Sequence, residues 1–565
     1  MVSPNLSKKT EIAPVLNNDA KKLFQVIYKD QIKTDEKDNT PKIKVSELIS
    51  KMSFYYEKIR NTVDYKEENL LRKNAIERIL RRHVLIEGFF KISKSAEIAS
   101  HLIIELIRAG YLPNNKVPEA KIEEIGQIIE KYIKLRTFTL ARIKPTQYLR
   151  KGNVGKMRDE LRERSSLTNW FLSLAASEIE EKLGRNKINQ VVVSNMYDIL
   201  TKKISLPEKL SKYQEDLKIQ IYISIHRIFL KFDNEMLSLI LFKYYNSSWK
   251  SPKDEDIAKV AQNILSLKTA IDNQVEHPLK KETDKITGKY SVYFSILVDV
   301  IDDDPVKVFE AINHDPKAFP RLIKEMCKKK YQTLKSRLWR IATRSIFYIF
   351  ITKSIFVILL EIPAIKFFGE DINLISLAIN VGFPAVLLFL IVVLTGLPSD
   401  ENTDKIIEGI NEVVFKEADK GGEYVLHKPA KRGAVVDFVF SIFYFITFFL
   451  SFGFVIWALD KIYFNWVSIV IFLFFLALVS YFGIKIKKHA RELTVIEDKE
   501  NILVFIVDFF YTPIVAVGKW LSEKFSRLNV FVFVLDFIIE APFKVFIEIA
   551  EEWTRYVKER KEDLG

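Results

Sequence analysis

The sequence predicts an all-α membrane protein. A helical cytoplasmic N-terminal domain is followed by four transmembrane helices, arranged as two antiparallel hairpins, and by a C-terminal amphipathic helical tail. Two observations predict this class. Four apolar runs lie between residues 345 and 486, each about as long as the roughly 20 residues that cross a bilayer. Before them, apolar residues recur at the three- and four-residue spacing of helices, and strand-like alternation is nearly absent. A purely soluble protein is excluded.

The first 344 residues are predicted to be helical and cytoplasmic. Residues 1–24 read as a flexible N-terminus without the apolar segment of an export signal. Two helical subdomains are expected at 25–143 and 156–316, because Pro145, Gly152 and Gly155 interrupt the periodicity around 144–154. Residues 317–344 are expected to form a basic juxtamembrane helix.

The four spans are predicted at 345–368, 374–397, 434–459 and 462–486. Only residues 369–373 join the first span to the second, and only Asp460 and Lys461 join the third to the fourth. Links this short force consecutive spans to run antiparallel, which predicts the two hairpins.

Basic residues predict the orientation, because positive charge near the ends of spans stays on the cytoplasmic side. The opposite side carries only Lys366 and Lys461. We therefore expect a multi-pass protein of the plasma (inner) membrane, with both termini cytoplasmic and anionic inner-leaflet lipids as partners. The expected membrane-border basic residues are Lys335, Arg337, Arg340, Arg344, Lys431, Arg432, Lys485, Lys487 and Lys488.

A possible intramembrane polar site comprises Lys353, Glu361, Asn380, Pro384 and Asp437. Eight residues of regular helix separate Lys353 from Glu361, which predicts that these two do not pair and makes Asp437 the better partner for Lys353. Pro384 removes the helical donor of the Asn380 carbonyl and should kink the second span. Broken helices of this kind form substrate sites in transporters. The alternatives are a Lys353 side chain that reaches back to the headgroups and a plain structural kink.

Chemistry-bearing motifs are missing. The sequence has no phosphate-binding glycine loop and no zinc-binding His or Cys pattern, and Cys327 is its single cysteine. No catalytic residue, cofactor or metal site is therefore predicted. Asp299 and Asp302–Asp304 could bind a hard cation, but their place before Pro305 favours helix capping.

The tail, residues 501–560, is predicted to be amphipathic. Ile502–Val517 and Val530–Ile539 are about 16 and about 10 residues long, so neither is a convincing span. Aromatic and basic side chains favour a helix in the headgroup layer. A re-entrant hairpin, and helices packed on the protein's own soluble region, stay open as alternatives.

The formal net charge of +14 admits nucleic acid, anionic lipid or an acidic protein as partners. The membrane borders account for much of this excess. Nucleic acid is not expected, because no nucleic-acid-binding module surrounds the remaining basic cluster, which favours a solvated or lipid-facing helix surface. That cluster consists of Arg72, Lys73, Arg78, Arg81 and Arg82.

The leading functional hypothesis is a non-enzymatic membrane-anchored scaffold or interaction module whose cytoplasmic domain has a protein partner. One alternative is a small transporter or channel that uses the kinked second span. Another is a membrane-embedded enzyme acting on lipid, with Asp437, Glu361 or Asp302–Asp304 as its acid or metal ligand.

Overall fold

The structure, a computed structural model, is built almost entirely of helices, which confirms the all-α class. It describes residues 16–33, 40–64, 68–83, 95–143, 154–184, 187–314, 318–415, 424–426, 433–496 and 502–527, with scattered residues from 546 to 561. Among these, the two named strands are β1 (Ile204–Ser205) and β2 (Tyr424–Val425), which pair in parallel. The predicted boundary at 144–154 lies almost wholly outside the described residues.

The chain divides into two compact units. The N-terminal unit contains residues 25–287, 422–428 and 530–565, and the membrane unit contains residues 1–24, 288–421 and 429–529. Two helices, α1 (Asn18–Lys33) and α13 (Lys280–Asp303), contribute residues to both units.

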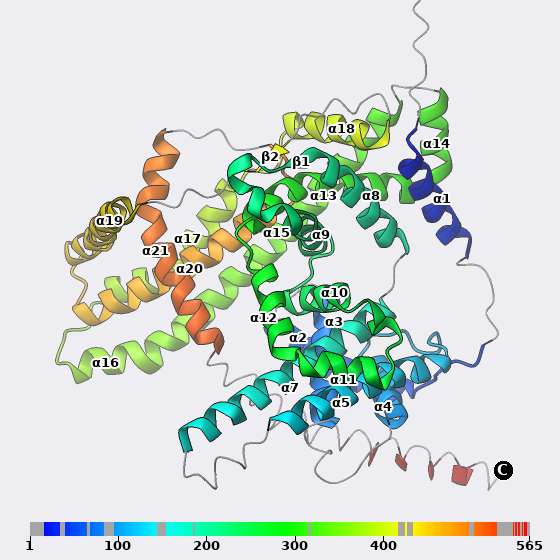
Figure 1. Cartoon of the computed structure of the whole chain (residues 1–565). Helices are drawn as coiled ribbons and strands as arrows, with labels where there is room; N and C mark the ends of the chain where they lie inside the picture. The colour runs from blue at the N-terminus through cyan, green and yellow to red at the C-terminus, as the bar shows by residue number, and fades with distance from the viewer. Residues whose placement is uncertain are drawn as a thin grey trace, which may run out of the picture. The chain divides into compact units, whose positions relative to one another are not determined.

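The N-terminal unit is an assembly of helices (Figure 1). Its elements are α2 (Glu47–Asp64), α3 (Glu68–Arg81), α4 (Ser95–Arg108), α5 (Ala120–Arg142), α7 (Val154–Leu183), α8 (Lys187–Lys203), η3 (Glu208–Tyr213), α9 (Gln214–Ile228), α10 (Asn234–Tyr245), η4 (Ser247–Lys250), α11 (Asp254–Gln262) and α12 (Ile264–Val275).

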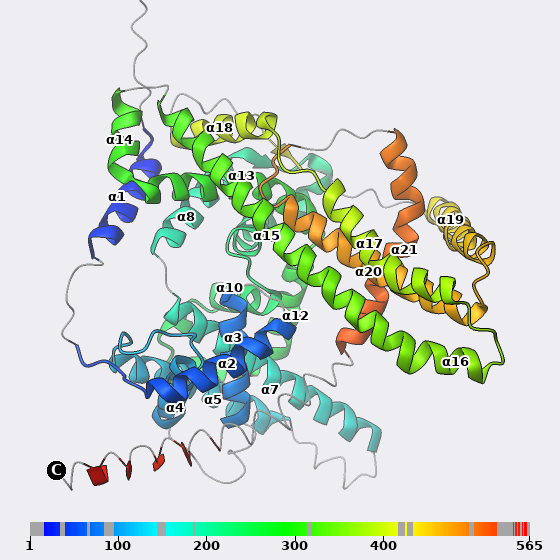
Figure 2. The same cartoon turned by 180° about the vertical axis from the view of Figure 1, so that it is seen from behind.

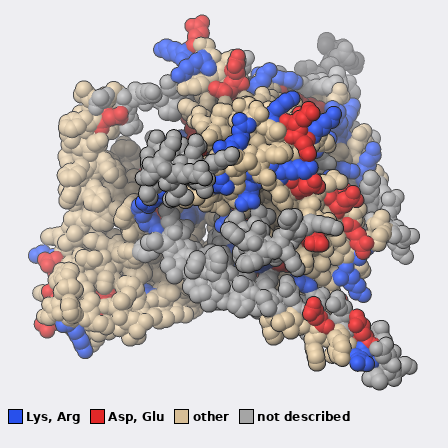
Figure 3. Space-filling view, turned by 60° about the horizontal axis from the view of Figure 1, so that its bottom comes forward, with Lys and Arg blue, Asp and Glu red and all other residues tan. Residues whose placement is uncertain are grey.

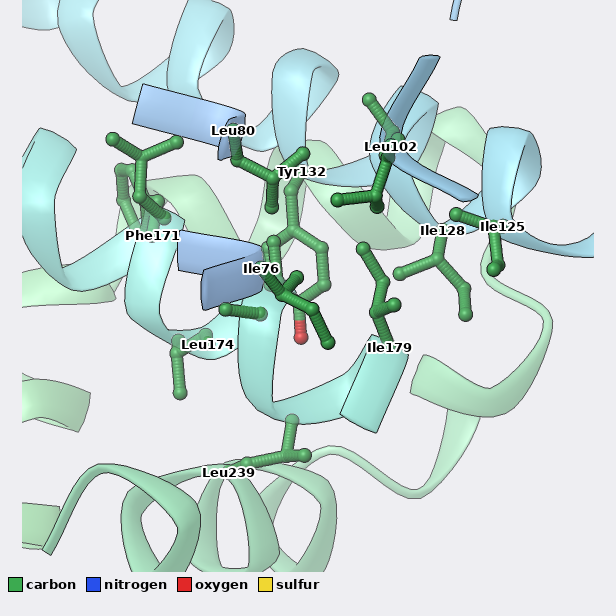
Figure 4. Close-up of a cluster of buried hydrophobic side chains, with 14 of the residues drawn as sticks. Ile76, Leu80, Leu102, Ile125, Ile128, Tyr132, Phe171, Leu174, Ile179 and Leu239 are labelled. Atoms are coloured by element: carbon green, nitrogen blue, oxygen red, sulfur yellow. The ribbon is translucent and has the colours of Figure 1, made fainter. Parts of the chain in front are cut away.

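The core of the N-terminal unit lies where α3, α4, α5, α7 and α10 meet. Figure 4 shows Ile76, Leu102, Tyr132, Phe171 and Leu239 converging from these five helices. These side chains occupy the apolar positions whose three- and four-residue spacing predicts helices in the sequence. The spacing places them on the one face of each helix that packs into the core.

The membrane unit contains the long apolar helices. Its elements are α14 (Pro305–His314), α15 (Ala318–Phe356), the π-helical turn η5 (Val357–Glu361), α16 (Ile362–Phe367), α17 (Leu374–Leu394), α18 (Asp400–Val414), α19 (Ala434–Asp460), α20 (Trp466–Ala490) and α21 (Ile502–Arg527). The predicted juxtamembrane helix and first span form one continuous helical stretch, Ala318–Phe367.

Five helical stretches of the described chain are long and apolar enough to cross a membrane, which identifies a multi-pass membrane protein. Four of them coincide with the predicted spans, and the fifth is Phe505–Lys524 within α21. In Figure 3 the face formed by these helices, at the left, is largely free of charged side chains. Their outward-facing Phe, Ile, Leu and Val side chains are exposed on the protein, as lipid-facing residues are.

The membrane helices pack through three apolar clusters. Helices α15, α17 and α20 run side by side in both views (Figures 1 and 2). The loops at the far ends of the two hairpins also meet, because the Asn373 side chain donates to the Tyr463 carbonyl at 3.4 Å and the Asn465 side chain donates to the Asp371 carbonyl at 3.4 Å.

The tail differs from its prediction at α21. The sequence treats 502–517 as too short to span, but α21 continues unbroken through Pro513 to Arg527. It packs on α20 and α19, so the alternative in which this segment packs on the soluble region is wrong. Small residues explain the close crossing, since a Cβ at Gly518 would overlap the carbonyl oxygen of Ala477. The second predicted stretch, 530–539, lies outside the described residues.

Candidate functional site

Four polar side chains meet inside the membrane helices, and we call them the polar cluster: Lys353 of α15, Glu361 of η5, Asn380 of α17 and Ser468 of α20. All four have 0% exposed surface. Apolar side chains of the same helices, among them Val357 and Val467, pack beside them. Placing an ionisable side chain in hydrocarbon costs free energy, so buried charged residues within membrane helices usually have a structural or functional role.

Glu361 is the centre of the polar cluster. Its Oε1 accepts a hydrogen bond from Asn380 Nδ2 at 2.5 Å and another from Ser468 Oγ at 2.8 Å. Its Oε2 lies 3.8 Å from Lys353 Nζ. The Asn380 amide also donates to the Ser468 carbonyl at 3.3 Å. Three separate helical stretches are thus linked through one carboxylate.

The prediction that Lys353 and Glu361 do not pair is wrong, and the reason is the π-helical turn η5. In a regular α-helix, eight residues rotate a side chain to about 80° from its starting direction. A π turn accommodates one extra residue, so Glu361 returns almost to the direction of Lys353. Pro363 explains the turn, because it lacks an N–H and its ring clashes with the carbonyl four residues earlier.

The other two predicted members of the intramembrane site lie outside the polar cluster. Asp437 sits at the start of α19 and is exposed, so the prediction that it partners Lys353 is wrong. Pro384 is buried within α17, which continues as one helix past it. Ser468 was missed because only ionisable residues, Asn380 and the proline were weighed, although a serine facing an apolar bundle is a recognisable signal.

The ammonium group of Lys353 lies among aromatic rings. Lys353 Nζ is 3.9 Å from the ring centroid of Phe475 and 5.5 Å from that of Phe356, so cation–π attraction supplements the charge pair. Three buried atoms of the cluster have no hydrogen-bond partner: Lys353 Nζ, Glu361 Oε2 and Asn380 Oδ1. Chemically, this arrangement can hold a charge pair or bind a small polar molecule between these atoms.

The expected membrane-border residues lie before the apolar part of α15, in the middle of that helix, and in the last turns of α20. Leu338 and Ala342 of α15 pack in the same cluster as Ile486 and Ala490 of α20. The basic side chains beside them are exposed: Lys335, Arg337, Arg340, Arg344, Lys485, Lys487 and Lys488. Lys431 and Arg432 lie outside the described residues.

The acidic cluster before α14 is divided between helix capping and ion pairs. Asp304 Oδ1 accepts the backbone N–H of Lys307 at 3.0 Å, as a residue that caps a helix does. Asp303 and Asp299 pair with Lys329 and Lys330 of α15. Within the described part of the chain, no group of three or more His, Cys, Asp or Glu side chains is placed to hold a metal ion.

The basic cluster of α3 is paired with acids, and only Arg81 among its five side chains is exposed. Arg72 binds Glu180 through two hydrogen bonds of 2.7 Å, and Lys73, which is fully buried, donates to Asp233 at 3.0 Å. The prediction of a solvated or lipid-facing surface is therefore wrong for four of the five residues and holds for Arg81 alone. The remaining pairs are Arg78–Glu57, Arg81–Glu77 and Arg82–Glu105.

A charged cleft of about 450 Å³ opens in the N-terminal unit between α5, α7, α10 and α11. At its base, Glu178 accepts hydrogen bonds from Lys131 at 2.7 Å and from the Tyr132 hydroxyl at 2.8 Å. Burial alone would raise the pKa of the Glu178 carboxyl, but Lys243 and Lys131 outweigh it and hold that pKa below its usual 4.5. Sequence patterns gave no sign of this cleft, because its residues come from distant helices.

No protein-family model, curated protein or solved structure matches this chain.

Proposed function

We propose that the protein is a membrane-anchored scaffold or interaction module, in which the long apolar helices anchor the chain and the N-terminal unit binds a protein partner. The observation that carries this proposal is the closure of the polar cluster. Asn380 and Ser468 donate hydrogen bonds to Glu361, and Lys353 forms an ion pair with it. All four side chains have 0% exposed surface, as expected of groups that hold helices together. A permeation path would instead need these groups to face water.

The charged cleft supports the second half of the proposal. It is lined by lysines and acids in equal measure, including Lys134, Lys250, Glu130 and Asp254. Alternating charges of this kind favour orientation and selection of a partner of complementary charge pattern.

The proposed orientation places both termini in the cytoplasm. The helix α20 ends at the basic border, so α21 starts on the cytoplasmic side. The other end of α21 carries Lys519, Lys524 and Arg527, which favours the same side. In Figures 1 and 2, α21 crosses α20 at a wide angle, which suits a helix that enters the membrane obliquely without traversing it.

In-cell photo-crosslinking tests the interaction role. A photoreactive residue at Lys250, in the cleft, should give a discrete crosslinked species, whereas one at Lys218, on the exposed side of α9, should not. Charge reversal at Asp254 should weaken the crosslink. Equal crosslinking at both positions would contradict a specific docking role for the cleft.

A specific observation favours transport as the second candidate function. Three atoms of the polar cluster are buried without hydrogen-bond partners, and they lie beside a π turn, a feature frequent at functional sites. Such a site could carry a proton or an ion if the helices opened.

Flux into proteoliposomes separates the two functions. The anchor proposal predicts that tracer ions and protons enter vesicles with the full chain no faster than empty vesicles. A flux that falls with Glu361→Gln and with Pro384→Ala would replace it with the transport proposal.

A further inference from the structure

The middle of α15 and the C-terminal end of α20 carry a group of basic side chains that the protein itself does not neutralise. We call this group the basic border: Lys335, Arg337, Arg340 and Arg344 of α15 with Lys485, Lys487 and Lys488 of α20. The two basic segments lie at one level, because Leu338 and Ala342 of α15 share one apolar cluster with Ile486 and Ala490 of α20.

Spacing places three arginines of the basic border on one face of α15. Arg337, Arg340 and Arg344 are separated by three and four residues, so they project from the same side of the helix. Leu334, Leu338 and Ala342, separated by four residues each, form the packed face. The arginine face is therefore directed away from the bundle interior.

Other basic clusters of the chain are paired with acids. The four basic residues of α3 and Arg82, which follows it directly, all have carboxylate partners. Lys329 and Lys330 of α15 pair with Asp303 and Asp299. In contrast, residues 326–344 and 466–491 contain no Asp or Glu. Among the described residues, no ion pair involves the basic border. Its positive charges can therefore bind an anionic group from outside the chain.

The surroundings of the basic border indicate what that partner is. Towards the membrane centre, α15 exposes Phe347 and Tyr348, and Trp339 is exposed within the arginine stretch itself. Lys485 Nζ lies 5.0 Å from the Tyr481 ring centroid, the aromatic setting of a membrane interface. A ligand that fits must carry an anionic group and an apolar part side by side.

We propose that the basic border is a binding site for the phosphate headgroup of an anionic phospholipid. Arginine recognises phosphate through paired N–H donors, and the acyl chains of the same lipid would cover the exposed aromatic residues. This proposal rests on α15 and α20 being membrane helices and is independent of the scaffold function.

Binding of short-chain lipids to the purified full chain in neutral detergent tests the proposal. Dioctanoyl phosphatidylglycerol should raise the unfolding temperature, whereas dioctanoyl phosphatidylcholine should not. Arg340→Gln/Arg344→Gln should weaken the phosphatidylglycerol affinity about tenfold or more, since each surface cation contributes roughly fivefold. The matched control is Lys366→Gln/Lys461→Gln, which removes two exposed cations from the opposite side and should leave the affinity unchanged.

Three results would overturn the proposal. One is equal affinity for the two lipids, and another is an equal loss in both double variants. The third is equal stabilisation by inorganic phosphate or by an oligonucleotide, which would make the basic border a general anion or nucleic-acid site. If Arg340→Gln/Arg344→Gln does not fold, Lys487→Gln/Lys488→Gln on α20 provides the same comparison.

Discussion

At the residue scale, the polar cluster replaces water with partners drawn from three helical stretches. Glu361 is held by Asn380 and Ser468 on one oxygen and by Lys353 on the other. Removing one member of a buried pair leaves the other charge uncompensated, which is more costly than removing both. The pair therefore constrains which arrangement of the helices is acceptable.

A double-mutant cycle tests this interpretation. Lys353→Met alone should lower the free energy of unfolding by about 3–5 kcal/mol, because the Glu361 charge stays buried. Lys353→Met/Glu361→Gln should lower it by less than the sum of the single changes, with a coupling of at least about 1 kcal/mol. Denaturant unfolding in detergent measures the free energy of unfolding of the wild type, Lys353→Met, Glu361→Gln and the double variant.

The exposed pair Lys519–Glu523 of α21 is the control for that cycle. Its nitrogen and oxygen lie 3.9 Å apart, close to the distance in the buried pair. Solvent screens it, so the coupling there should be below about 0.5 kcal/mol. Equal coupling at the two pairs would contradict the role given to the buried one.

A buried histidine of the N-terminal unit sets a pH dependence. His226 Nδ1 donates to the Tyr222 carbonyl at 2.8 Å, and burial lowers the pKa of this imidazole below its ordinary 6.5. Below about pH 6.5 this histidine is protonated in the unfolded chain but stays neutral in the folded chain. The free energy of unfolding is therefore unaffected above that pH and decreases below it.

His226→Asn, which keeps a donor for the carbonyl, should flatten this decline between about pH 6.5 and pH 5, where the slope approaches 1.4 kcal/mol per pH unit. Unfolding measured against pH reports the slope. Some of it should remain, because burial also lowers the pKa of His277. His489→Asn, at an exposed position, should change nothing.

At the element scale, irregular backbone features such as the π turn determine which side chains meet, and a regular helical period does not predict those contacts. Apolar runs predicted the positions of α17, α19 and α20 within a few residues, because length and hydropathy are properties of the sequence alone. The Lys353–Glu361 pair was not predicted, because the prediction assumed a regular helix through Pro363. The proline at position 363, inside the first apolar run, is the sequence signal for this irregular turn.

The α20–α21 crossing shows the same limit. Hydropathy interrupted by Asp508 and Pro513 made the segment look too short, while the fit of Gly518 against Ala477 exists only in three dimensions. The pairing of α3 cations with acids up to 160 positions away in the chain was equally invisible to a local pattern.

Gly518→Ala tests that crossing. The added Cβ would overlap the Ala477 backbone, so the free energy of unfolding should fall by about 1–3 kcal/mol, although alanine favours the helix. Gly453→Ala in α19, where a Cβ meets open space, should be neutral or stabilising by up to about 1 kcal/mol. Thermal unfolding in detergent compares them, and an equal effect of the two changes would contradict the close packing of α21.

At the scale of the whole molecule, the proposed roles depend on which compartment holds the N-terminal unit. The helices establish a multi-pass protein, and the basic residues favour a cytoplasmic location for both chain ends. The scaffold role and the lipid site both require this orientation, since a partner and an anionic inner leaflet are met only there.

Cysteine labelling of intact cells tests this central claim most directly. Cys327 is the only native cysteine and is buried, so its replacement by alanine gives a clean background. Single cysteines then replace the exposed Lys202, Glu559 and Lys461. A membrane-impermeant maleimide should label position 461 and leave positions 202 and 559 unmodified until the cells are opened. Labelling of position 202 in intact cells would contradict the account.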